Sequence, residues 1–196
     1  MFANRFTAVV DACVLFSPLK RNLILSLAEA ELFRVRWSER ILDETEIATV
    51  RYLTDKGCID PEERARRART MMTTAFDDAN VVDYDGISHD IGKLPDERDR
   101  HVIAAAIKCR ADIIVTDNLK DFPGTVLGRY NIEVKSADEF IADTIDLNSS
   151  LSVSAIRTMR QRLNRPEKTP EALLLDLEAL GLTLTVDQLR ESITLV

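Results

Sequence analysis

Residues 94–123 hold the pattern that most limits how this chain can fold: a helix, then a short buried strand, with acidic loops on both sides. The helix is predicted from apolar residues at helical spacing, Ile103, Ala106 and Ile107. The unbroken β-branched run at 113–115 is typical of a parallel strand buried on both faces. Asp99 then falls in the first turn of the helix, and Asp117 just beyond the strand. Because parallel α/β sheets bind ligands at their carboxyl edge, we expect both carboxylates to face one crevice.

Strands and helices alternate through most of the chain before residue 146. Apolar runs predict further strands at 6–10, 33–37, 81–82 and 132–134. Amphipathic spacing and capping residues predict helices at 18–31, 38–52, from 61 onward and at 137–145. The Ser38 hydroxyl is expected to cap the second of these helices. This alternation predicts an α/β fold, a three-layer α/β/α sandwich with a mainly parallel central sheet.

Beyond residue 146 the pattern becomes purely helical. We therefore predict an α/β domain at 1–146 and a helical C-terminal extension at 147–196. Thr185 and Gln188 are interpreted as a capping-box pair for the last helix. Apolar side chains of the extension are expected to pack on the main domain, with reception of a partner helix as the alternative.

Charge and apolar content limit where the chain works. The formal net charge of −7 argues against a protein that coats nucleic acid, which needs Lys and Arg against phosphate. It does not exclude a nuclease, because a metal ion held by carboxylates attracts phosphate locally. No apolar run is long enough to span a bilayer, and the start MFANRFTAVV lacks the features of a secretory signal. We therefore expect a cytoplasmic protein without membrane association.

Three aspartates occupy positions that invite a catalytic interpretation. Asp11 ends the strand at 6–10 between apolar neighbours, where a carboxylate is costly to bury unless it is paired or coordinated. Asp99 follows Asp96 by three residues, so one or both have a simpler interpretation as helix caps, and Asp117 as part of a turn after the strand. Taken together, the three would meet at one sheet edge.

Three further acids extend this set without a clear choice among them. Glu44 leans toward the apolar face of its helix, but Glu46 is related in the same way to its own neighbours, so periodicity does not choose between them. Asp121 fits either a loop turn or the same site. Clustered carboxylates repel one another unless a cation neutralises them, and all-oxygen ligation suits Mg²⁺ or Mn²⁺. The predicted chemistry is metal-assisted attack on phosphorus.

Other α/β chemistries lack their motifs. The residues after Asp11 are Ala-Cys-Val, without the second Asp that an aspartyl-phosphate phosphatase needs. Neither a GxGxxG nor a GxxxxGK[ST] loop follows the first strand, and no GxSxG elbow is present. His89 and His101 are expected at the surface or at helix ends.

Three segments in order carry a family resemblance: VVDACVLF at 9–16, SERILDE at 38–44 and DRHVIAAAIKCRADIIVTDNLKDFP at 99–123. Over residues 6–145 the chain resembles the PIN-domain nucleases, especially the bacterial VapC-type toxin ribonucleases. The resemblance implies an acidic catalytic and metal-binding set of Asp11, Glu44, Asp99 and Asp117, with Asp121 as an alternative fourth ligand. It also implies that Ser38, Thr116 and Asn118 border the substrate.

The resemblance further implies a Mg²⁺- or Mn²⁺-dependent endoribonuclease, the toxin of a type II toxin–antitoxin pair, with an RNA substrate, a cognate antitoxin and a homodimeric state. One alternative is a housekeeping PIN nuclease in RNA maturation, and another is a catalytically silent PIN-like binding module. Two arginine clusters are candidate phosphate contacts, with an ordinary solvated face as the alternative. They are Arg64, Arg66, Arg67 and Arg69, and Arg157, Arg160, Arg162 and Arg165.

Overall fold

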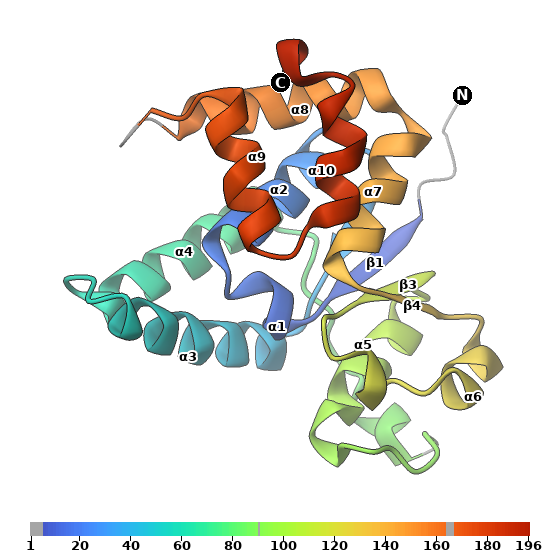
Figure 1. Cartoon of the computed structure of the whole chain (residues 1–196). Helices are drawn as coiled ribbons and strands as arrows, with labels where there is room; N and C mark the ends of the chain where they lie inside the picture. Colours follow the sequence, from blue (N-terminus) through green and yellow to red (C-terminus); the bar gives the residue numbers. More distant parts are fainter. Residues whose placement is uncertain (1–5, 90, 164–166) are drawn as a thin grey trace. The chain divides into compact units, whose positions relative to one another are not determined.

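A parallel sheet of four short strands organises the fold of this computed structural model, which describes residues 6–89, 91–163 and 167–196. The strands are β1 (Thr7–Val10), β2 (Arg34–Arg36), β3 (Ile113–Val115) and β4 (Glu133–Lys135). They lie in the order β2-β1-β3-β4, and every neighbouring pair is parallel (Figure 1). The predicted α/β class with a parallel sheet and C-terminal helices is confirmed.

The central strands β1 and β3 are buried because their side chains are apolar on both faces, as a doubly covered parallel strand requires. Val9, Val10, Ile114 and Val115 are fully buried. In the register between the strands, Val10 lies opposite Val115, and the Asp11 N–H donates to the Val115 carbonyl at 3.0 Å. The residues that follow the two strands are therefore neighbours at the carboxyl edge of the sheet.

The same compact unit contains helices as well as the sheet. They are α1 (Ala12–Leu15), α3 (Glu39–Asp55), α4 (Pro61–Ala75), α5 (Arg100–Lys108) and α6 (Gly124–Leu127), with 3₁₀ helices at Asp85–His89, Glu97–Asp99, Leu119–Asp121 and Gly128–Tyr130. The Ser38 hydroxyl accepts from the Ile41 N–H at 3.3 Å, so its predicted capping role is confirmed. Helix α5 packs on β1 and β3, and α3 packs along α4 as a hairpin (Figure 1).

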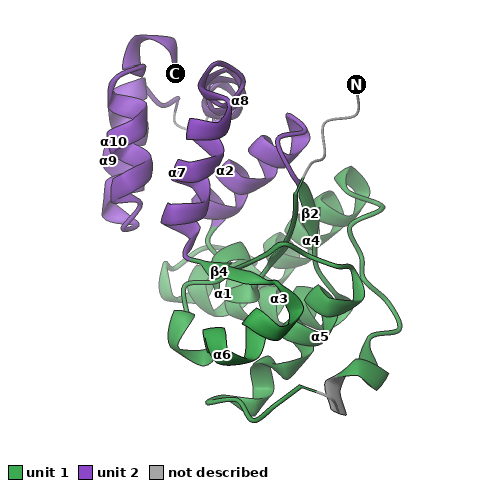
Figure 2. Cartoon of the chain, turned by 90° about the vertical axis from the view of Figure 1, so that its right-hand side faces the viewer, with its two compact units in different colours: residues 1–17, 34–135 green, residues 18–33, 136–196 purple. Residues whose placement is uncertain are grey.

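The remaining helices form a second compact unit made of residues 18–33 and 136–196, shown in purple in Figure 2. They are α2 (Pro18–Glu29), α7 (Ala137–Leu147), α8 (Ser149–Arg162), α9 (Pro170–Ala179) and α10 (Thr183–Arg190), followed by a 3₁₀ helix at Ile193–Leu195. Helix α2 groups with the C-terminal helices because it packs on α7 and α8. The boundaries of these two compact units differ from the predicted domain boundary at 146/147. That domain boundary stays a prediction.

Two local expectations are wrong. Residues 81–82 form no strand; the only pairing there is an isolated bridge between Trp37 and Asn80, and Val82 is exposed to solvent. A two-residue apolar run gives too few ladder hydrogen bonds to extend the sheet. Thr185 lies inside α10 and does not begin it. Among the described residues, no helix has both the length and the apolar character that crossing a bilayer requires.

Candidate active site

Asp11 is the most tightly held acid at the carboxyl edge of the sheet. It follows β1 directly, and its side chain is only 5% exposed. Its Oδ1 accepts from the Ala12 N–H at 2.6 Å, at the start of α1, and its Oδ2 accepts from the Thr116 hydroxyl at 2.8 Å. Charge-assisted hydrogen bonds of this kind compensate a buried carboxylate for the loss of water and fix its orientation.

Cys13 in α1 and Thr116 connect the segment after β1 to the loop after β3. The Cys13 thiol donates to Asp11 Oδ2 at 3.1 Å and lies 3.2 Å from the Thr116 hydroxyl. Thr116 Oγ1 accepts from the Asn118 N–H at 3.1 Å, and the Cys13 sulfur accepts from the Asp117 N–H at 3.3 Å. Burial, with the nearby Asp11 charge, raises the pKa of the Cys13 thiol to about 12. Cys13 is therefore a neutral hydrogen-bond donor here.

Asp99 lies where α5 begins, but it does not cap that helix. The capping role in this segment belongs to Asp96, whose Oδ1 accepts from the Arg98 N–H at 2.9 Å. Partial burial, then the negative charges of Asp11, Asp96 and Asp121, raise the pKa of Asp99 to about 6. The electrostatics thus show that Asp99 shares its surroundings with acids from three other points in the sequence.

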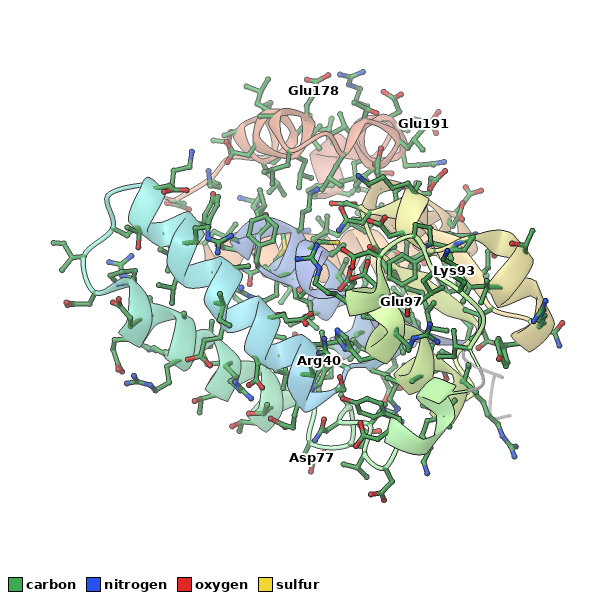
Figure 3. The ribbon with its side chains drawn as sticks, turned by 90° about the horizontal axis from the view of Figure 1, so that it is seen from below. Arg40, Asp77, Lys93, Glu97, Glu178 and Glu191 are labelled. Carbon is green, nitrogen blue, oxygen red and sulfur yellow. The ribbon has the colours of Figure 1, made fainter. Side chains whose placement is uncertain are left out.

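Glu44 reaches toward the start of α5 from α3. Its Oε1 lies 3.1 Å from His101 Nε2 and accepts from Arg40 Nε at 3.3 Å. Arg40, labelled in Figure 3, also donates to the Arg98 carbonyl at 3.3 Å, so α3 contacts the segment that carries Asp99. Burial alone would raise the pKa of Glu44, but His101 and Arg40 outweigh it, and the pKa lies below its ordinary value.

The structure separates Glu44 from Glu46, which the sequence pattern left equivalent. Glu46 turns to α4, where it accepts from Arg69 Nη1 at 3.0 Å. Arg69 also donates to Asp43 and Glu39, both at 2.7 Å. Glu46 therefore belongs to an ion-pair network inside the α3–α4 hairpin, and Glu44 is the acid that faces α5.

Asp117 and Asp121 occupy different positions in the loop after β3. Asp117 is exposed, and its backbone N–H is bonded to Cys13. Asp121 is half-buried, and its charge adds to the raised pKa of Asp99 after burial, Asp11 and Asp96. Of the two, Asp121 is the less exposed and acts on Asp99 through its charge.

Two of the three other residues expected near a substrate, Ser38 and Thr116, have structural roles. Ser38 is fully buried and caps α3, so contact with substrate stays a prediction for it. Thr116 is also fully buried and orients Asp11, while Asn118 is exposed beside it. The sequence interpretation included Asp96 as one of two candidate caps, but it did not include Arg40 or the contact between His101 and Glu44. A usable signal existed for Arg40, which lies four residues before Glu44 on one helix face.

The acids fit a divalent cation by charge and by chemistry. Asp11, Asp99 and Asp121 carry the oxygen ligands that Mg²⁺ and Mn²⁺ prefer, and their mutual repulsion would be relieved by a cation. Among the described side chains, no three His, Cys, Asp or Glu groups are already gathered tightly enough to enclose an ion. Mg²⁺ retains several waters and uses only one or two carboxylates in many sites, so such a spread set can still bind it.

Four of the eight arginines in the two basic clusters bind acids or backbone carbonyls of the protein itself. Arg69 pairs with three acids, Arg66 pairs with Glu63, and Arg162 pairs with Glu29. Arg160 donates to the backbone carbonyls of Val196 and Lys168. Arg64, Arg67 and Arg157 are exposed, and Arg165 lies outside the described residues. For the four arginines with these partners, the ordinary structural role is the better interpretation.

Comparisons with known proteins cover both parts of the chain. The family model described as "PIN domain" matches residues 7–120, and the model described as "VapC50 C-terminal domain" matches residues 137–191. The "Putative ribonuclease VapC50" of Mycobacterium tuberculosis is 42% identical over 84 residues, which are 43% of this chain and 48% of that protein. The match thus spans about half the length of this curated relative. No solved structure matches the chain.

Proposed function

Because the chain belongs to the PIN-domain family, we propose that it is an endoribonuclease that hydrolyses RNA phosphodiester bonds with Mg²⁺ or Mn²⁺. One observation supports the proposal above others: the pKa of Asp99 is raised to about 6 by burial and by the charges of Asp11, Asp96 and Asp121. Acids that perturb one another in this way are typical of functional sites. The relative from Mycobacterium tuberculosis, which carries a ribonuclease name, supports the same substrate class.

In this proposal, Asp11, Asp99 and Asp121 bind the cation, and Glu44 completes the set from α3. The cation would supply an activated water and stabilise the departing oxygen. Asp11 contributes a fixed carboxylate, because the Ala12 N–H and the Thr116 hydroxyl hold its two oxygens. Asp99 contributes an oxygen ligand that no capping bond engages.

The loop after β3 would form the border of the substrate site. Thr116 fixes the start of this loop through its bonds to Asp11 and to the Asn118 N–H. Asp117 and Asn118 are exposed there, and this exposure supports the proposal that they contact RNA. We assign Asp117 to this border and Asp121 to the cation.

The proposed biological role is that of a toxin in a type II toxin–antitoxin pair, working in the cytoplasm as a homodimer and restrained by a cognate antitoxin. The matches to a VapC50 model and to a protein of that name support it. Expression of the wild-type chain alone should arrest growth, and coexpression of the antitoxin should restore it. Normal growth with a chain that cleaves RNA would favour a housekeeping nuclease instead.

The activity is tested by cleavage of RNA with Mn²⁺, with and without excess chelator. The double variant Asp11→Asn and Asp99→Asn should lose at least about 10²-fold in rate, the lower range for groups that take part in proton transfer or activation. Asp77→Asn is the control, because Asp77 is an exposed acid in the loop after α4 (Figure 3). Full activity in the double variant would refute the assigned site.

A catalytically silent binding module is the second candidate function. It is favoured by one observation, the lack of three tightly gathered metal-ligating groups among the described side chains. Calorimetry with Mn²⁺ separates the two candidates. Absence of Mn²⁺ binding by the wild-type chain, with its helical circular dichroism intact, would support the binding module and exclude the nuclease.

A further inference from the structure

His101 is a polar residue in an otherwise apolar stretch of α5. Its side chain is only 4% exposed, and residues 102–106 beside it are buried and apolar. Within the described part of the chain, neither ring nitrogen of His101 forms a hydrogen bond. Buried polar groups are nearly always bonded in native structures, so this imidazole requires an explanation.

The neighbour of the imidazole ring, the Glu44 carboxylate, offers an explanation. His101 Nε2 is 3.1 Å from Glu44 Oε1, an ion-pair distance, although the ring N–H is not aligned for a hydrogen bond. His101 is also two residues after Asp99 on the same segment. The imidazole therefore connects Glu44 of α3 with α5, the helix at whose start Asp99 lies.

Arg40, which lies on α3 with Glu44, contacts the same carboxylate. Its Nε donates to Glu44 Oε1 at 3.3 Å, and its Nη2 donates to the Arg98 carbonyl at 3.3 Å. Glu44 is thus fixed between a largely exposed guanidinium and a buried imidazole. Of the two, the imidazole is far more buried, since the His101 side chain is 4% exposed and that of Arg40 is 52% exposed.

We propose that His101 is a positioning residue that holds the Glu44 carboxylate toward the acidic cluster, so that Glu44 takes part in binding the divalent cation. The proposal rests on the function proposed above. Groups that orient a ligand without touching the metal typically change metal affinity by about 10- to 100-fold when they are removed. A purely apolar residue would fill the same space in α5 without the cost of burying ring nitrogens.

The test compares His101→Leu with His101→Gln by Mn²⁺ calorimetry and by RNA cleavage. Leucine fills space but has no donor, so we expect Mn²⁺ affinity to fall by about 10-fold or more. Glutamine places an amide N–H near the position of Nε2, so His101→Gln should keep most of the wild-type affinity. The difference between these two variants reports the contact and not the volume of the side chain.

A double-mutant cycle with Glu44→Gln decides whether His101 acts through Glu44. If it does, His101→Leu should weaken Mn²⁺ binding in the wild-type background and have little further effect in the Glu44→Gln background. Equal losses in both backgrounds would overturn the proposal. An unchanged Mn²⁺ affinity in His101→Leu would overturn it as well.

Val102→Ala is the matched control for damage to α5. Val102 is fully buried in the same helix, and its truncation should lower the melting temperature. If this variant lost Mn²⁺ affinity as His101→Leu does, the effect would be structural and the proposal would fail. Failure of the wild-type chain to bind Mn²⁺ or to cleave RNA would instead contradict the proposed function itself, so the two failures are distinguishable.

Discussion

Asp99→Asn should make the metal-free protein more stable at neutral pH, although it removes an acid proposed as a metal ligand. The substitution keeps the shape of the side chain and takes one negative charge out of the cluster. Asp99 makes no capping bond to α5, so no such bond is lost. What remains is relief from the partial burial of a charge, and then from the repulsion by Asp11, Asp96 and Asp121.

The size of this effect follows from the pKa. Burial first, and then the neighbouring acids, raise the pKa of Asp99 from 3.8 to about 6. At about 1.4 kcal/mol for each pKa unit, the charge costs the folded state at most about 3 kcal/mol. Asp99 is only half-buried, so solvent screening lowers this to about 1 kcal/mol. For a chain of this size, that corresponds to a rise of roughly 2–4 °C in melting temperature.

The difference in stability between Asp99→Asn and the wild type depends on pH. Below about pH 4, Asp99 is protonated in both the folded and the unfolded chain, so variant and wild type should be equally stable. Between about pH 4 and the folded pKa of about 6, the unfolded chain releases the proton first. The stability of the wild type therefore falls as pH rises through this window, and the advantage of Asp99→Asn reaches its full size above it.

Thermal unfolding in excess chelator measures this advantage at several pH values. Asp77→Asn serves as the control, and its difference from wild type should not grow across the same window. Addition of Mn²⁺ should then raise the melting temperature of the wild type more than that of Asp99→Asn. A ligand stabilises the folded state according to its affinity, and the variant lacks one of the proposed metal ligands. A variant that is no more stable than wild type at about pH 7.5 without metal would refute the clustering of charge at Asp99.

Three other predictions concern separate parts of the molecule. Asp121→Asn should weaken Mn²⁺ binding in calorimetry more than Asp117→Asn does, and the reverse order would contradict the assignment of the fourth ligand. Asp138 of α7 accepts from two N–H groups at the start of α10, so Asp138→Ala should destabilise α10 by about 1 kcal/mol, seen as faster amide hydrogen exchange at the start of that helix and not in α4. Arg69→Met should cost about 1 kcal/mol in urea unfolding, and the loss should shrink at high salt because screening already weakens the wild-type ion pairs. A salt-independent loss would show that packing of the Arg69 stem, and not its charge, joins α3 to α4.

The sheet and the position of Asp11 were predictable because they depend on local pattern. The apolar runs at β1 and β3 specify strands buried on both faces, and Asp11 directly follows the first of them. The Ser38 cap was predictable for the same reason, since its acceptor and the Ile41 N–H are three residues apart. The failed strand at 81–82 shows the limit of this approach, because two residues carry too little pattern.

The choice among the acids depended on partners that are remote in the sequence. Glu44 and Glu46 have the same periodicity, and only the contacts with His101 and Arg69 distinguish them. The preference for Asp121 over Asp117 likewise comes from the charge that acts on Asp99, a property that no spacing reveals.

The sequence by itself determined the parallel α/β class, the strand ends that carry the acids and the caps made within one turn of a helix. Tertiary structure decided the partners. The cap of α10 is the clearest case, because Asp138 of α7 accepts from the Leu184 and Thr185 N–H groups at 2.9 and 2.8 Å. Apolar periodicity records which side of an element is buried, whereas a hydrogen bond or a charge depends on what lies across from it. That information exists only once the chain has folded.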